Sequence, residues 1–158
     1  MNIVGQWHSP MLLKRRTGTS QYTTDLENIP KGPGVYVFTR KFGENYSVIY
    51  VGKAMNLFNR IAGQLNNNKL MTDLLQQKEN AKAKNGGRFL LFCEIKPKSG
   101  QDKQKITALV EKALIQQFLL DGHPLVNIKS ARRPSHSISF RGNQSSKNLS
   151  GKELVIHA

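Results

Sequence analysis

Five polar side chains occupy positions that packing alone does not require. Tyr36 and Tyr50 each alternate with β-branched neighbours, so each phenol should point to the face of its strand opposite those neighbours. Glu111 falls within an apolar stripe, where a carboxylate is costly unless it is paired or binds a metal. Arg60 and Asn127 complete the set. Phenols and carboxylates can transfer protons, and a guanidinium can hold an anion, so this set could perform acid–base chemistry on an anionic substrate.

The two tyrosines are predicted to lie in a β-hairpin. Two prolines and two glycines within residues 28–34 form a breaker cluster that should open the ordered core. Residues 35–40 predict a strand, and residues 48–52 predict the returning strand after a turn-rich connection. We expect Gly52 to end that strand, where a side chain could block the turn.

Helices and a third strand should position the remaining groups. Apolar residues three and four apart predict amphipathic helices over 53–65 and 106–120, with another helix over 70–85. The apolar run at 88–95 predicts a central strand covered on both faces. The order β–β–α–α–β–α predicts an α+β domain with a small three-stranded antiparallel sheet flanked by helices.

We expect three parts along the chain. Residues 1–30 form an N-terminal extension, residues 31–128 form the α+β domain, and residues 129–158 form a basic Ser/Arg-rich C-terminal extension. Within the last part, residues 137–140 and 153–157 could be short strands, and a flexible basic tail is the alternative.

The charge points to a polyanionic partner. The 158 residues include 24 Lys and Arg against 10 Asp and Glu, a net charge of +14. Nucleic acid is the first candidate partner, an anionic membrane the second, and a merely soluble basic protein the third alternative. No apolar run is long enough to span a bilayer, and the N-terminus lacks the apolar core of a signal peptide. With Cys93 as the single cysteine, we expect a reducing, cytoplasmic setting.

The blocks that contain these residues resemble the GIY-YIG nuclease superfamily. The first triplet is GVY at 34–36 and the second is YVG at 50–52. The resemblance covers residues 31–128 and is greatest to the N-terminal nuclease domain of the incision protein of the bacterial repair excinuclease. Further matching positions supply a lysine, a helix arginine, a helix glutamate and an asparagine: Lys53, Arg60, Glu111 and Asn127.

The resemblance implies a metal-dependent endonuclease that hydrolyses phosphodiester bonds, with DNA as the expected substrate. It implies one divalent ion, Mg²⁺ or Mn²⁺, held by Glu111. A single carboxylate suits Mg²⁺, which keeps most of its waters, whereas a two-metal site needs more acidic residues nearby.

The resemblance also implies that Tyr36 activates the attacking water. A free phenol has a pKa of about 10, so only about one in a thousand is ionised at neutral pH. A metal and a nearby cation would favour the phenolate, and Lys53, Arg40 or Lys41 could supply that cation. Tyr50 would then orient the water or donate to the phosphate.

The remaining roles follow from the same comparison. Arg60 fits the clamping of a phosphate oxygen, and Asn127 supports the site through hydrogen bonds. One position departs from the pattern, since members often carry His or Tyr where this chain has Gln64. Glutamine is neither an acid nor a base, so either the two tyrosines suffice or the proton takes another route.

Two alternatives stay open at this point. The chain could be a nucleic-acid-binding module that has kept the fold without catalysis, or a nuclease that acts on RNA. Each residue taken alone also fits a plainer role, a strand aromatic or a solvated charge. The expected nucleic-acid contacts are two glycines and seven basic residues: Gly34, Gly52, Arg40, Lys41, Lys14, Arg15, Arg16, Arg132 and Arg133.

Overall fold

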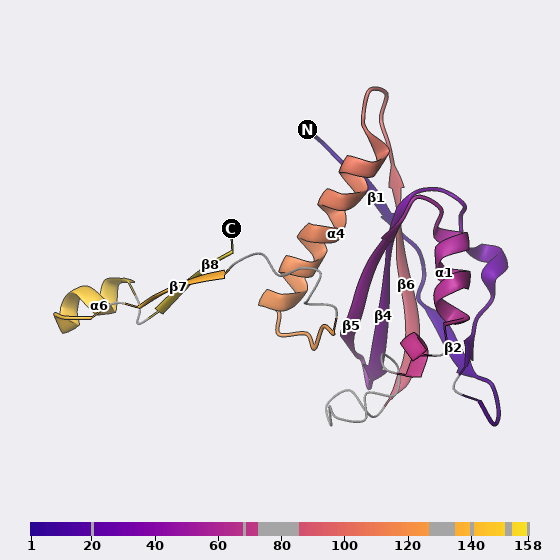
Figure 1. Ribbon diagram of the computed structural model, residues 1–158, viewed down its shortest axis with the longest axis horizontal. Coiled ribbons are helices and arrows are strands. Elements are labelled where there is room, and N and C mark those ends of the chain that lie inside the picture. Colours follow the sequence, from indigo (N-terminus) through magenta and orange to yellow (C-terminus); the bar gives the residue numbers. More distant parts are fainter. Residues whose placement is uncertain are drawn as a thin grey trace. The chain divides into compact units, whose positions relative to one another are not determined.

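A computed structural model describes residues 1–19, 21–67, 69–72, 86–126, 135–139, 141–150 and 153–157 (Figure 1). The chain divides into two compact units, Met1–Asn127 and Ile128–Ala158. Each unit is described by itself below. No helix among the described residues is long and apolar enough to cross a bilayer.

The first unit is built on an antiparallel sheet of six strands. The strand order is β3-β2-β6-β4-β5, and β1 also pairs with β6. β4 and β5 form the predicted hairpin, whose turn contains Gly43 with a φ of 61°. The strands are β1 (Val4–Trp7), β2 (Met11–Arg15), β3 (Tyr22–Thr23), β4 (Gly34–Phe42), β5 (Asn45–Ala54) and β6 (Gly87–Lys96).

The α+β class and the antiparallel sheet are confirmed, but the predicted number of three strands was wrong. The additional strands β1, β2 and β3 come from the N-terminal segment, which shows no clear hydrophobic period. β1 pairs with the Cys93–Lys96 half of β6, and β2 pairs with the Arg88–Leu90 half. Together they cover an edge of β6 that would otherwise present unpaired backbone groups.

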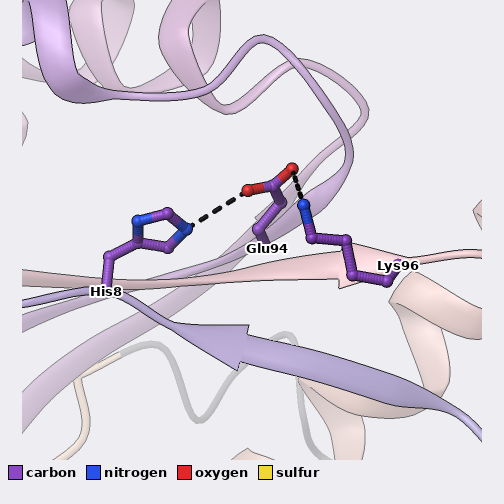
Figure 2. A network of polar contacts seen from close by, with 3 residues as sticks. All are labelled: His8, Glu94 and Lys96. Atoms are coloured by element: carbon purple, nitrogen blue, oxygen red, sulfur yellow. Dashed lines mark hydrogen bonds and ion pairs between the residues drawn. The ribbon is translucent and has the colours of Figure 1, made fainter.

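A polar network holds the segment after β1 against β6 (Figure 2). His8 Nε2 lies 3.2 Å from Glu94 Oε2, and Lys96 Nζ donates to Glu94 Oε1 at 2.7 Å. The His8 ring also stacks on Phe92, with ring centroids 4.8 Å apart. The hydrogen bond from Lys96 lowers the pKa of Glu94, against the opposing effect of burial. The carboxylate is therefore held in its charged form beside these two side chains.

Two helices cover opposite faces of the sheet, α1 (Leu57–Leu65) and α4 (Lys103–Leu120) (Figure 1). Tyr36 and Phe92 belong to the core cluster that includes the buried residues of α1. Ile106 of α4 packs with Cys93 and Ile95 on the other face. Because strand side chains alternate, odd-numbered β4 residues face α4 and even-numbered ones face α1.

Local sequence explains where these helices begin. The Asn56 side chain accepts a hydrogen bond from the backbone N–H of Asn59 at 3.0 Å and caps α1. Asp102 caps α4 in the same way through Lys105 N–H at 3.1 Å. α1 begins later than predicted because β5 continues to Ala54. Of the helix predicted over 70–85, residues 69–72 are helical and residues 73–85 lie outside the described residues.

The second unit contains a small antiparallel sheet. β7 (Ser135–Ser139) pairs with β8 (Glu153–His157), and α6 (Gln144–Ser150) lies between them in the chain. Of the two alternatives for this segment, the structure has the short strands.

Two glycine substitutions should change stability in opposite directions. A Cβ on buried Gly34 would overlap the carbonyl oxygen of Cys93 and the Leu57 side chain, so Gly34→Ala should lower the free energy of unfolding by about 1–3 kcal/mol. Gly63 lies within α1 with open space around it, so Gly63→Ala should raise that energy by about 0.5–1 kcal/mol. Urea denaturation measures both. Equal stability of the two variants would contradict the packing described for Gly34.

Candidate active site

The tyrosine pair lies on the sheet face that α1 covers. Tyr36 stands directly opposite Gly52, and Phe38 stands opposite Tyr50, so the two phenols are diagonal neighbours on one face. Their ring centroids are 6.1 Å apart with an interplanar angle of 30°. Tyr36 is 2% exposed, while Tyr50 is partly exposed. Solvent can therefore reach Tyr50 more readily than Tyr36.

Gly52 makes room for the ring of Tyr36. A Cβ at Gly52 would overlap the Tyr36 ring and its hydroxyl oxygen. Gly52 lies inside β5, which continues to Ala54, and so does not end the strand as we expected. The glycine is needed because an aromatic ring crosses the hairpin at this point, which is a packing reason for its presence.

Gln64 of α1 holds the Tyr36 hydroxyl. Its Nε2 donates to Tyr36 Oη at 3.0 Å. Burial raises the pKa of Tyr36 far above its usual value of 10.0, and Tyr50 raises it further. The bond from Gln64 and the positive charge of Arg60 act in the opposite direction, without cancelling the effect of burial. The Tyr36 phenol is thus neutral at physiological pH.

The cation that acts on Tyr36 is Arg60. We expected Lys53, Arg40 or Lys41 in this role; Lys53 pairs with Glu111 on the other face of the sheet. Arg40 and Lys41 lie four and five residues further along β4, about 13–17 Å from Tyr36. Arg60 instead projects from α1, the helix that packs over the tyrosines.

Arg60 lines a polar groove beside the tyrosines. The groove has a volume of about 540 Å³. The Arg60 side chain is exposed, and within the described residues it makes no hydrogen bond or ion pair. Gln64 lines the same groove, so the buried hydroxyl of Tyr36 is one hydrogen bond away from it. The other lining residues are Ala54, Met55, Asn56, Asn59, Gly63 and Asn67.

Glu111 and Lys53 form an ion pair on the other face of the sheet. Lys53 stands opposite Val35, so its side chain projects towards α4, which carries Glu111. Lys53 Nζ donates to Glu111 Oε2 at 2.8 Å. The side chains are 46% and 21% exposed, respectively, so solvent reaches both. The structure therefore divides the predicted site between two faces.

The tyrosine pair and the Lys53–Glu111 ion pair both border the outer edge of β5. β5 ends the strand order, and residues Tyr50 to Lys53 of β5 contribute to both faces. The segment after α4 follows this edge, where Val126 N–H donates to the Ile49 carbonyl at 2.8 Å. Asn127 is the next residue and lies outside the described residues.

The other predicted contact residues lie away from this edge or have different surroundings. Arg40 Nη2 donates to Ser47 Oγ at 3.2 Å, and Lys41 Nζ lies 5.2 Å from the centre of the Tyr46 ring. Lys14, Arg15 and Arg16 belong to the β2–β3 hairpin, three strand positions from β5 and about 14 Å away across the sheet.

Three predicted contacts remain. Gly34 is buried against α1 and β6, which explains it by packing rather than by a ligand. Arg132 and Arg133 lie outside the described residues.

Two features of the site were not anticipated. In the sequence, Gln64 stands where an acid or base is often found. In the structure, it is the hydrogen-bond partner of Tyr36. Gly63 lines the groove on an exposed helix position. An exposed glycine in the middle of an amphipathic helix is a signal that could have drawn attention to this face.

A metal ion at this site would have one carboxylate ligand. The part of the chain that the structure describes holds no group of three or more His, Cys, Asp or Glu side chains arranged for a metal. Glu111 is partly exposed and, within the described residues, pairs with Lys53 alone, which fits an ion that keeps water and takes its other ligands from a substrate phosphate. It does not fit a closed, all-protein metal site.

The chain contains a short region similar to UvrABC system protein C. Segments of 41, 43 and 41 residues are 51% identical to that protein from Petrotoga mobilis, Neisseria gonorrhoeae and Maricaulis maris, respectively. The matches cover 26–27% of this chain and only 6–7% of the length of those relatives. No family model and no solved structure matches the chain.

The buried phenol should make stability sensitive to alkaline pH. The unfolded chain releases the Tyr36 proton near pH 10.0, while the folded chain holds it to higher pH. The stabilisation is therefore present below pH 10 and is lost as pH rises above it, at about 1.4 kcal/mol per pH unit. Urea denaturation between pH 9 and 11.5 should show a steeper loss for the wild type than for Tyr36→Phe. Parallel curves would mean that Tyr36 is not buried as described.

Proposed function

We propose that the protein is a metal-dependent endonuclease of the GIY-YIG type that hydrolyses phosphodiester bonds in DNA. The observation that carries the proposal is the stacked pair Tyr36 and Tyr50, joined through Gln64 to a polar groove that Arg60 lines. The short similarity to UvrABC system protein C and the net charge of +14 support the same conclusion.

Arg60 is the proposed phosphate clamp. Its guanidinium is exposed at the groove and has five donors in a planar fork that matches phosphate oxygens. The same donors can stabilise the negative charge that develops during hydrolysis. Its charge already acts on the Tyr36 phenol. A phosphate held by Arg60 would therefore lie near the tyrosine pair.

Tyr36 is the proposed acceptor of the proton from water, and Tyr50 is proposed to orient that water. Because burial raises the pKa of Tyr36, this role requires additional positive charge when substrate binds. Gln64 contributes by donating to Tyr36 Oη, a bond that favours the phenolate. A divalent ion, Mg²⁺ or Mn²⁺, when bound, would supply positive charge and polarise the phosphate.

Glu111 is the proposed metal ligand, with Lys53 beside it. The ammonium of Lys53 holds the carboxylate in place at 2.8 Å. When the carboxylate has another partner, the ammonium can donate to a phosphate oxygen. A pair this exposed contributes about 0–1 kcal/mol to stability, so its members can be substituted without unfolding the protein. Asn127 keeps its proposed role of supporting the site through hydrogen bonds.

Contacts to the nucleic-acid backbone are proposed for the basic residues outside the site. These contacts would position the substrate without reading its sequence. The net charge predicts a strong dependence of binding on salt concentration. The proposed residues are Arg40, Lys41, Lys14, Arg15, Arg16, Arg132 and Arg133.

A second candidate is a nucleic-acid-binding module without catalysis. Two observations favour it: Lys53 already pairs with the Glu111 carboxylate, and burial raises the pKa of Tyr36. This candidate predicts salt-sensitive binding with no cleavage under any divalent metal. A nuclease that acts on RNA is a further alternative, which matched DNA and RNA substrates in one assay would distinguish.

Removing the carboxylate should abolish cleavage and spare binding. With Mg²⁺ or Mn²⁺ and a panel of plasmid, nicked, single-stranded and branched DNA, we expect Glu111→Gln and Tyr36→Phe to cut at least about a hundredfold more slowly than the wild type. Binding measured in chelator should stay within about twofold. Glu44→Gln, at the exposed hairpin turn, is the matched control and should cut normally. Cleavage by Glu111→Gln at the wild-type rate would refute the metal assignment, and a wild type that leaves every substrate intact would refute the nuclease.

Arg60→Lys tests whether geometry or charge matters at the groove. Lysine keeps the charge but lacks the planar fork, so the cleavage rate should fall by about 10²–10³-fold. Arg141→Lys, an exposed position in the second unit, should leave the rate unchanged. An equal rate in wild type and Arg60→Lys would show that Arg60 acts only as a diffuse positive charge.

A further inference from the structure

The groove along α1 contains more polar groups than a phosphate clamp needs. Asn59 and Gly63 are one helical turn apart, and Asn67 follows at the same spacing just past the end of the helix. Arg60 and Gln64 form the neighbouring row. Part of this groove therefore lies beyond the groups that the proposed hydrolysis uses.

The structure shows no conformational or packing reason for a glycine at position 63. It adopts an ordinary helical conformation, because its φ is not among the positive values found at other glycines. A Cβ at Gly63 would meet no atom within 4 Å. Glycine inside a helix is less favourable than alanine, since it loses more conformational freedom on folding. A ligand that approaches the helix backbone closely would account for the missing side chain.

The amides around Gly63 offer both donors and acceptors. The Asn67 side chain accepts a hydrogen bond from Leu70 N–H at 3.0 Å, which leaves its NH₂ group to donate. The side chain of Asn59 has no hydrogen bond to any other described residue. Met55, at 40% exposed, adds an apolar wall. Donors and acceptors beside a position without a side chain suit the edge and face of a nucleobase.

We propose that this groove binds one unpaired nucleotide of the substrate strand, with its base against Gly63 between Asn59 and Asn67 and its phosphate at Arg60. The inference rests on the proposed function, because it places this nucleotide next to the phosphate that is cleaved. A paired base shows its edge only to groups that project into a groove of the duplex. A base that enters a recess on the protein must first leave the helical stack.

The test measures binding in the absence of metal, so that cleavage plays no part. Two fluorescent DNA duplexes of one sequence are compared by anisotropy in EDTA, one fully paired and one with a single unpaired nucleotide at its centre. The wild type should bind the second duplex about five- to a hundredfold more tightly, the range expected for one base held by bidentate hydrogen bonds. Fully paired DNA, held by phosphate contacts, should bind all variants equally.

Gly63 variants then separate a role in binding from a role in folding. Gly63→Ala should raise Tm by about 1–4 °C and reduce the preference for the unpaired nucleotide, and Gly63→Leu should abolish that preference. Ala113→Leu, a similar enlargement on an exposed position of α4, should keep it. Loss of the preference in a more stable Gly63→Ala protein cannot be attributed to unfolding.

The outcomes also distinguish this inference from the proposed nuclease. If Gly63→Leu keeps the preference, or if the wild type shows none, the subsite is refuted while metal-dependent cleavage can still be observed. If the wild type cuts no substrate but prefers the unpaired nucleotide, and Gly63→Leu lacks that preference, the nuclease is refuted and the subsite stands.

Discussion

The ring of Tyr36 lies against Gly52 across the β4–β5 hairpin, and the rest of the candidate site depends on this contact. Any larger residue at position 52 would displace the ring. With the ring in place, α1 packs over it and brings Gln64 within hydrogen-bonding distance of its hydroxyl. The same packing directs Arg60 towards the groove beside it. A single glycine thus links the hairpin register to the position of the helix and its polar side chains.

Burial gives this arrangement its main chemical constraint. A phenol that is 2% exposed resists ionisation, so the chemistry proposed for Tyr36 needs positive charge that arrives with substrate and metal. Glu111 also has a charged partner within the protein, because Lys53 Nζ donates to its carboxylate at 2.8 Å. The proposed site is divided over two faces of β5, the last strand in the order of the sheet.

Much of the fold could be predicted from local patterns. The β-branched and aromatic runs at residues 35–40 and 48–52 predicted the hairpin, and helical spacing predicted α1 and α4, with errors of a few residues where Asn56 and Asp102 cap the helices. The N-terminal strands were missed because they are short and gain their stability from pairing with β6. In the site, the types of the groups were evident from sequence. Their partners were not, since Lys53 and Glu111 are 58 residues apart and Gln64 and Tyr36 are 28 apart.

The sequence by itself determined which residues of each strand and helix face the core, because the periods of strands and helices are local properties of the chain. It also determined the charge that any partner must complement. Only the tertiary structure decided that Tyr36 and Glu111 lie on opposite faces of the sheet, that Gln64 holds the Tyr36 hydroxyl, and that Arg60 is the cation that acts on this phenol. These features depend on which faces of distant elements pack together, and that choice minimises the free energy of the whole chain rather than of any one segment.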